Sequence, residues 1–206
     1  MVDIRPFKAI RYTSNPGDIE ELITQPYDKI TPEMQMQYYA QSEFNYCRLI
    51  LPIEEDRYAV AKERSDDWLK KGMLAQDAVA AIYVYFQDFE VFGRKHTRKG
   101  FVAAVHLHPF DEKVVLPHEK THSGPKIDRL KMLKATMKNL EMGFMLYPDP
   151  KKETIAVLDK ASRKRPIIDA VDEYGVRNRL WRLDVKGQIE KIRTVIKPEQ
   201  IVIADG

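Results

Sequence analysis

The chain alternates between two spacings of apolar residues, and each spacing predicts a different kind of element. Alternation of apolar and polar positions is typical of half-buried strands, and it marks a long hairpin over residues 80–90 and 98–108 around Gly93-Arg94-Lys95. Two later runs are expected to pair around Tyr174-Gly175. The short apolar runs that predict the other strands cover residues 4–12, 46–51, 143–147, 167–171, 180–184 and 201–204.

Apolar residues at spacings of three and four predict helices over residues 31–41, 57–71, 126–140, 151–163 and 191–196. The clearest start is Thr31-Pro32-Glu33, which supplies a capping hydroxyl, a proline at the first helical position and an acid in the first turn. In the helix over 126–140, the apolar face is expected to contain Ile127, Leu130, Leu133, Met137 and Leu140, with Lys131, Lys134 and Lys138 facing solvent.

These elements follow one another without a strict strand–helix–strand rhythm. The sequence therefore predicts an α+β fold, with a mixed and mainly antiparallel sheet and several packed helices. No internal repeat or low-complexity tract separates the chain into parts, so residues 1–206 are expected to form one region.

Composition excludes several classes of protein. Of the 206 residues, 44% are apolar and 32% are charged, as in an ordinary soluble globular protein. No apolar run approaches the ~18 residues of a membrane span, so no membrane partner is expected. The net charge is only +3, and the 34 lysines and arginines are spread among 31 acids, which disfavours nucleic-acid binding.

The single cysteine bears on where the protein is found. Cys47 cannot form an internal disulfide, which favours a reducing cytoplasm. It lies within the apolar run 46–51, so a small core residue is a better interpretation than a nucleophile.

Residues 118–122 read His-Glu-Lys-Thr-His, which matches the zinc-protease pattern H-E-x-x-H. That site needs both histidines on one continuous helix, so that the two rings face a single ion. Here Pro117 precedes the motif and Ser123-Gly124-Pro125 follows it, and these residues stop a helix. We therefore reject a zinc metalloprotease and expect no zinc at this motif.

A second pair of histidines lies at the end of the predicted hairpin. His106 and His108 alternate with Val105 and Leu107, so both rings are expected on the face opposite to the apolar one. Two histidines at this spacing can chelate a metal from one strand face, but the sequence shows no third ligand, and a metal is disfavoured.

The segment after the zinc-protease match is better explained as a loop that leads into a helix. Ser123 or Gly124 would cap the helix and Pro125 would take its first position. The free amides of the first turn, with Lys126 and Arg129 beside them, would suit a phosphate. Surface pairing of Asp128 with Arg129 is an equally good interpretation of the same residues.

Several motifs in one order carry a resemblance to a family. His118-Glu119-x-Thr121, followed by Lys126-x-Asp128-Arg129, resembles the signature of an uncharacterised bacterial and archaeal family, domain of unknown function 1015. The likeness covers essentially the whole chain. Its further motifs are Ile4-Arg5-Pro6-Phe7, Gln25-Pro26-Tyr27-Asp28-Lys29-Ile30, Asn45-Tyr46 with Arg48-Leu49-Ile50-Leu51-Pro52, Trp68 with Gly72-x-Leu74-x-x-Asp77, and Tyr83-x-Tyr85-x-Gln87.

The last residues also resemble a family motif. Residues 201–206, Ile-Val-Ile-Ala-Asp-Gly, look like the start of Ala-Asp-Gly-His-His-Arg. The resemblance implies that the chain is the N-terminal half of a longer family-type chain, cut at Asp205-Gly206 and inactive alone. A half of this kind could self-associate through an exposed sheet edge.

The histidine motif is similar to the Gly-His-His-Arg of free-serine kinases with the ParB/sulfiredoxin-like fold. By that resemblance, the intact protein is expected to be a nucleotide-dependent phosphotransferase that uses ADP or ATP and Mg²⁺ on a small hydroxyl compound resembling serine, and the fold is expected to be ParB/sulfiredoxin-like in part. The residues expected to hold the nucleotide phosphates are Thr121, Lys126, Arg129, Asp205 and Gly206.

Catalysis is assigned to three further residues by the same resemblance. Asp28 or Glu119 would orient the acceptor hydroxyl, and His118 would act beside them. Glu119 could instead hold Mg²⁺ together with Asp128. A turn-capping role for Asp28 and a structural role for His118 are equally good interpretations.

The main alternative is a nucleotide-binding switch or partner-binding module without catalysis, as in partition-type proteins with the related fold. A kinase makes a phosphorylated acceptor, whereas a switch makes at most free phosphate. The small-molecule substrate and the nucleotide are the expected partners in the first case.

Overall fold

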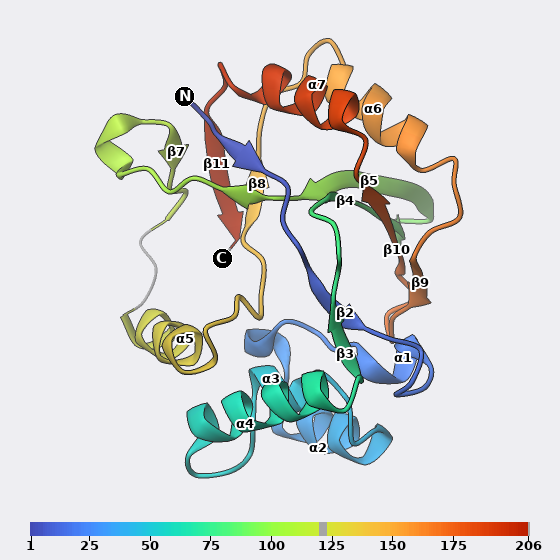
Figure 1. Cartoon of the computed structure of the whole chain (residues 1–206), viewed down its shortest axis with the longest axis vertical. Helices are drawn as coiled ribbons and strands as arrows, with labels where there is room; N and C mark the ends of the chain where they lie inside the picture. Colours follow the sequence, from blue (N-terminus) through green and yellow to red (C-terminus); the bar gives the residue numbers. More distant parts are fainter. Residues whose placement is uncertain (120–122, 206) are drawn as a thin grey trace. The chain divides into compact units, whose positions relative to one another are not determined.

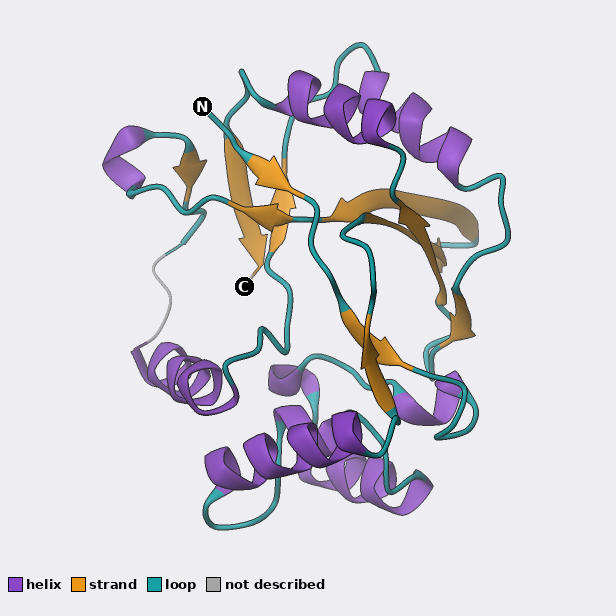
Figure 2. Cartoon of the chain, in the orientation of Figure 1, coloured by secondary structure: helices purple, strands orange, loops and turns teal. Residues whose placement is uncertain are grey.

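The computed structural model describes residues 1–119 and 123–205, and it divides the chain into two compact units (Figure 1). The strand-rich unit consists of Met1–Ala9, Asp77–Glu119 and Gly143–Gly206. The helical unit consists of Ile10–Gln76 and Lys120–Met142. Helices and mainly antiparallel strands are mixed along the chain, as Figure 2 shows by colour, so the predicted α+β class is confirmed.

The largest sheet belongs to the strand-rich unit and is antiparallel throughout, in the order β5-β4-β10-β9. Its strands are β4 (Ile82–Val91), β5 (Arg94–Val102), β9 (Ile168–Val171) and β10 (Arg177–Leu183). The predicted hairpin is β4–β5, and the predicted pairing around Tyr174-Gly175 is β9–β10. The β4–β5 turn is Phe92-Gly93, with positive φ at both residues, as a two-residue hairpin turn requires.

Two smaller sheets complete this unit. β11 (Ile201–Asp205) lies between β7 (Val115–Leu116), to which it is parallel, and β8 (Phe144–Leu146), to which it is antiparallel. β1 (Ile4–Arg5) pairs with β6 (Ala104–Val105), and a short 3₁₀ helix, η2 (Phe110–Glu112), precedes β7.

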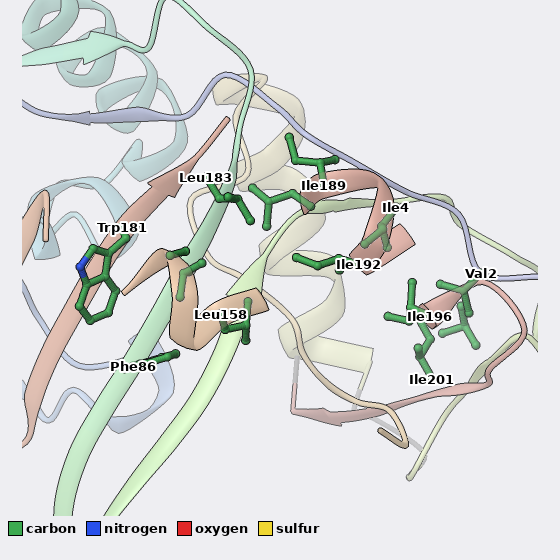
Figure 3. Packing of buried hydrophobic residues seen from close by; sticks show 14 of the residues in the cluster. Val2, Ile4, Phe86, Leu158, Trp181, Leu183, Ile189, Ile192, Ile196 and Ile201 are labelled. Atoms are coloured by element: carbon green, nitrogen blue, oxygen red, sulfur yellow. The ribbon is translucent and has the colours of Figure 1, made fainter. Parts of the chain in front are cut away.

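Two helices cover this unit's main core. α6 (Glu153–Ala161) and α7 (Lys186–Ile196) lie side by side in Figure 1. Leu158 of α6 and Ile192 of α7 are completely buried, and they pack into a cluster with Phe86 and Trp181 from the sheet (Figure 3). Burial of this continuous apolar cluster is the main stabilising term for the unit.

The helical unit has short helices around a second, smaller core. Its elements are β2 (Ile10–Tyr12), α1 (Ile19–Leu22), η1 (Tyr27–Lys29), α2 (Pro32–Gln41), α3 (Cys47–Ile50), α4 (Arg57–Lys70), β3 (Leu74–Gln76) and α5 (Ser123–Thr136). The Thr31 hydroxyl accepts a hydrogen bond from the Met34 amide, so the predicted cap of α2 is confirmed. The predicted stop after α4 is also confirmed, because Gly72 has a φ of +71°.

The prediction of one strand over residues 4–12 is wrong. The segment contains two short strands, β1 and β2, which pair with β6 and β3 respectively. Pro6 lies just after β1, and proline has no backbone N–H with which to continue a ladder.

The prediction of a strand over residues 46–51 is also wrong, because this run forms the helix α3. The side chain of Asn45 is completely buried and fixes the backbone at the start of α3 through its hydrogen bonds. Its Oδ1 accepts from the Cys47 amide at 2.9 Å, and its Nδ2 donates to the carbonyls of Glu21 and Ile23. This local bonding of an asparagine to nearby backbone overrides the β propensity of the run. Cys47 is a core residue, as predicted, and burial raises the pKa of its thiol to about 11.

The predicted apolar face of the helix over 126–140 is exposed instead of buried. α5 ends at Thr136, and its exposed apolar side chains include Ile127 and Leu130, which are 55% and 49% exposed. Lys138, predicted to face solvent, is mostly covered and donates to Asp66 at 2.7 Å. The buried residues of α5 are Met132 and Thr136, so the helix packs with a side of mixed polarity and not with the predicted apolar face.

Among the described residues, the structure has no helix that is long and apolar enough to span a bilayer.

Candidate functional site

The start of α5 lies in the segment that carries the family-like motif. Ser123, Gly124 and Lys126 are exposed in its first turn. The predicted cap at Ser123 or Gly124, with Pro125 at the first helical position, is wrong, because α5 already begins at Ser123 and Pro125 is its third residue. Proline is tolerated there because the first amides of a helix have no intrahelical acceptor. Lys126 and the first-turn amides therefore lie on the surface of the helical unit, where an anion could reach them.

Arg129 lies one turn further along α5, and all three of its guanidinium nitrogens donate hydrogen bonds to other protein atoms. Nε donates to Asp128 Oδ2 at 2.9 Å, and Nη2 makes a second, shorter contact with the same carboxylate. Nη1 donates to Glu141 Oε2 at 3.0 Å and to the carbonyl oxygen of Ile50 at 3.1 Å. The guanidinium also lies over the ring of Tyr27, 3.9 Å from its centre. Two neighbouring donors on one carboxylate oxygen, together with stacking on a ring, suit the planar guanidinium of arginine and would not suit lysine.

Asp128 is the second centre of this ion-pair network. Besides Arg129, its carboxylate accepts from Arg57 and from the hydroxyl of Tyr58, the latter at 2.8 Å. Burial acts to raise the pKa of Asp128, but the hydrogen bonds from Arg129 and Tyr58 outweigh it and hold the pKa below its usual value. Asp128 is therefore a fixed, ionised acceptor.

Glu141 completes the network from the residues that follow α5. Its second oxygen, Oε1, accepts from the Tyr27 amide at 3.2 Å. Nearby, the hydroxyl of Tyr46 donates to the Leu140 carbonyl at 2.6 Å, which fixes the same stretch of backbone. Arg57 and Arg129 thus face two carboxylates, and the four formal charges balance.

Polar contacts with α4 help to select the side on which α5 packs, which also buries Met132. Arg57 and Tyr58 lie in the first turn of α4 and bind Asp128. Towards the other end of the two helices, Lys138 donates to Asp66 and to the Ser65 hydroxyl of α4. Ion pairs at both ends hold α5 along α4, and its first turn is fixed as a result.

Of the sequence-predicted site residues, the structure brings Asp128 and Arg129 into direct contact. Surface pairing of these two residues was one of the two interpretations that the sequence left open, and the pairing is present. Asp28 is exposed in η1 beside Tyr27. Lys126 is exposed, as described above.

Five predicted residues lie in the strand-rich unit or outside the described residues. His118 and Glu119 are exposed in a bend before α5, with Nε2 and Oε2 3.7 Å apart. Asp205 is the exposed last residue of β11. Thr121 and Gly206 lie outside the described residues. Since His118 and Glu119 precede the helix, they do not have the helical setting that a zinc protease needs.

Sequence reasoning missed the partners of Asp128 and Arg129. Arg57 and Tyr58 are some 70 positions away along the chain, as their separation from Asp128 shows, and no local spacing connects them. Glu141 directly follows a predicted apolar face, and nothing in the sequence pointed to its role. Tyr27 was noted as part of a family-like motif, and its ring packs against the Arg129 guanidinium.

Comparison with known proteins gives a family for this chain. Residues 4–206 match the model of a family described as "Protein of unknown function (DUF1015)". The chain belongs to this family. No curated protein and no solved structure shows a significant match. The resemblance inferred from the motifs is thereby confirmed, and the activity of this DUF1015 protein has to be argued from its own residues.

Proposed function

We propose that the intact protein is a nucleotide-dependent phosphotransferase acting on a small hydroxyl compound, and that the first turn of α5 binds the nucleotide phosphates. One observation supports this most: an exposed, glycine-containing first turn with Lys126 is held in place by the ion-pair network behind it. Phosphoryl transfer needs little beyond positioning and charge stabilisation, so a fixed cationic turn suits it. A cytoplasmic location is proposed with it.

Within this proposal, the arginine has a different role from the lysine. Asp128 and Glu141 neutralise Arg129 and occupy its donors, so we assign it to positioning of the turn. Direct phosphate contacts are assigned to Lys126, to the first-turn amides and, from the motif alone, to Thr121. Asp205 and Gly206 are proposed to add a second phosphate-binding turn, on the strength of the resemblance to the ParB/sulfiredoxin-like kinases.

The acceptor and the metal are assigned to residues before the helix. Glu119 is exposed and is proposed to orient the acceptor hydroxyl or to bind Mg²⁺, with His118 as its neighbour in the transfer of the proton. Asp128 is already bound by two arginines and Tyr58, so the proposal does not use it as a metal ligand. Mg²⁺ would be held by Glu119, phosphate oxygens and water, in keeping with its preference for oxygen ligands. Asp28 remains a second candidate for orienting the acceptor.

The experiment is a transfer assay on the full product of the gene. The protein is incubated with Mg²⁺, ATP or ADP, and L-serine, and phosphoserine is measured by mass spectrometry. We expect phosphoserine to form, and we expect Lys126→Ala to reduce the rate at least ~10-fold, the equivalent of one lost charge-assisted contact. Lys134→Ala, an exposed lysine two turns along the same helix, is the matched control and should keep the rate.

Other outcomes distinguish the alternatives. Nucleotide binding with free phosphate and without a phosphorylated acceptor would support the nucleotide-binding switch over the kinase. Equal rates in Lys126→Ala and Lys134→Ala would remove the phosphate role of α5. An absence of nucleotide turnover across a panel of small alcohols, with no nucleotide bound, would contradict both functions.

A further inference from the structure

A histidine in the strand-rich unit has an unused ring nitrogen. His108 lies in the loop between β6 and η2, and its side chain is only 15% exposed. Its Nδ1 lies 2.7 Å from Glu112 Oε2. Its Nε2 is buried and has no hydrogen-bond partner among residues 1–119 and 123–205.

A buried ring nitrogen without a partner is unusual, because nearly all buried polar atoms in proteins have a hydrogen-bond partner. The carboxylate on Nδ1 fixes the tautomer: it accepts the Nδ1 proton and leaves the Nε2 lone pair as an acceptor in the neutral ring. A histidine oriented in this way by a carboxylate is the usual form of a metal-binding histidine. A cation bound to Nε2 would supply the partner that this nitrogen does not find among the described residues.

His106 supplies a second imidazole at a suitable distance. The two ring centres are 4.8 Å apart and the ring planes are inclined by 73°. Two imidazoles bound to one tetrahedral ion, with metal–nitrogen distances of about 2.0–2.1 Å, have ring centres ~5 Å apart. The pair therefore already has the separation that a shared ion requires.

The backbone around the pair is anchored, while one ring can adjust. The His106 amide donates to the Asp3 carbonyl at 2.9 Å, and the Glu112 amide donates to the Pro109 carbonyl at 3.1 Å. The side chain of His106 is exposed, so its ring can turn a nitrogen towards the ion without loss of core packing.

We propose that His106 and His108 form a binding site for a divalent transition ion of the kind that prefers imidazole, such as Zn²⁺, Ni²⁺ or Cu²⁺, with Glu112 as the outer partner of His108. These ions accept nitrogen ligands readily, unlike Mg²⁺ and Ca²⁺. In the described part of the chain, no three His, Cys, Asp or Glu side chains are arranged to hold a metal together. The proposed site is thus a two-histidine chelate, in which water or a substrate would fill the remaining coordination positions of the ion.

This inference reverses an expectation from the sequence. The two histidines were noted there as a weak metal candidate because no third ligand was apparent. The structure adds Glu112, which acts through Nδ1 and does not bind the ion. The inference is independent of the proposed phosphotransferase, so either can fail without the other.

The test is a calorimetric titration of the tag-free, chelator-treated full chain with Zn²⁺, compared with single-residue variants. We expect one site, lost on His108→Ala or His106→Ala. Glu112→Gln should weaken it by about 10- to 100-fold, as is typical for an outer partner of a ligand histidine. His96→Ala, which removes an exposed histidine of β5, is the matched control and should bind like the wild type.

A second readout serves if a variant does not fold. In ¹⁵N-labelled wild type, the imidazole spectrum should show the Nε2 resonance of His108 shift on addition of Zn²⁺, with Nδ1 remaining protonated. Zn²⁺ binding that is equal in the His96, His106 and His108 variants would overturn the proposal. So would an unchanged His108 spectrum at saturating Zn²⁺.

Discussion

Replacement of Arg129 by alanine is expected to lower the free energy of unfolding of the helical unit by about 2–4 kcal/mol, somewhat less than the loss of a fully buried ion-pair partner. Arg129 is 22% exposed at its side chain, and its removal leaves Asp128 with one arginine and Glu141 with none. The loss would be measured by urea unfolding followed by circular dichroism. The reason for the large effect is that two half-buried carboxylates lose a charge-assisted partner at once.

Two further variants make this prediction specific. Arg129→Lys should recover little, because an ammonium group cannot stack on Tyr27 while it donates to both Asp128 and Glu141 with the geometry of the guanidinium. Lys71→Ala is the control, since Lys71 forms an exposed pair with Asp67 and its loss should cost at most about 1 kcal/mol. Equal losses for Arg129→Ala and Lys71→Ala would show that the network does not stabilise α5.

The same variant should show a dependence on pH. The pKa of Asp128 is lowered in the folded protein, so its stabilising contribution is present above its unfolded pKa of ~3.9 and is lost as the pH falls through the folded value. The difference in stability between wild type and Arg129→Ala should therefore be largest near neutral pH and should shrink in acid.

Trp181→Ala is expected to cost about 3–5 kcal/mol of stability in the strand-rich unit. Trp181 is buried in the centre of β10, and its ring packs edge-to-face on Phe86 with centres 5.1 Å apart (Figure 3). Its indole N–H donates to the Lys164 carbonyl at 2.8 Å, so the substitution opens a cavity and also removes a hydrogen bond. Thermal and urea unfolding would measure the loss.

The matched control for this core position is Tyr174→Ala. Tyr174 is an exposed aromatic in the β9–β10 turn, and its loss should change stability by no more than about 0.5 kcal/mol. A Trp181→Ala variant as stable as Tyr174→Ala would contradict the position of Trp181 in the core.

Local signals account for the elements that the sequence predicted correctly. The cap at Thr31, the glycine after α4 and the hairpin turn that contains Gly93 act within a few residues, and the structure confirms each of them. The expected alternation of Val105 and Leu107 with the two histidines is wrong, because β5 ends at Val102 and Leu107 is 85% exposed. The run 46–51 was misassigned because one buried side chain, Asn45, decides its conformation through bonds to residues more than 20 positions away. Propensity does not contain that information.

The prediction of which face of α5 is buried was wrong for a related reason. Periodicity assumes that the most apolar side of a helix faces the protein, but here the buried side contains Met132 and Thr136, and ion pairs with α4 help to select it. Separation in sequence also explains why the ion-pair network was not predicted. Asp128 and Arg129 were identified as candidates from the sequence. Their partners Arg57, Tyr58 and Glu141 could be connected to them only from the three-dimensional structure.

The first turn of α5 as a phosphate site is the central claim, and nucleotide binding to the purified chain tests it most directly. Calorimetric titration with ATP and with ADP, in the presence of Mg²⁺, should detect binding that Lys126→Ala weakens by about 10-fold or more, the loss expected for one charge-assisted phosphate contact. Lys134→Ala should leave the affinity unchanged. Binding of equal strength in the wild type and in Lys126→Ala, or no binding of either nucleotide, would contradict the claim.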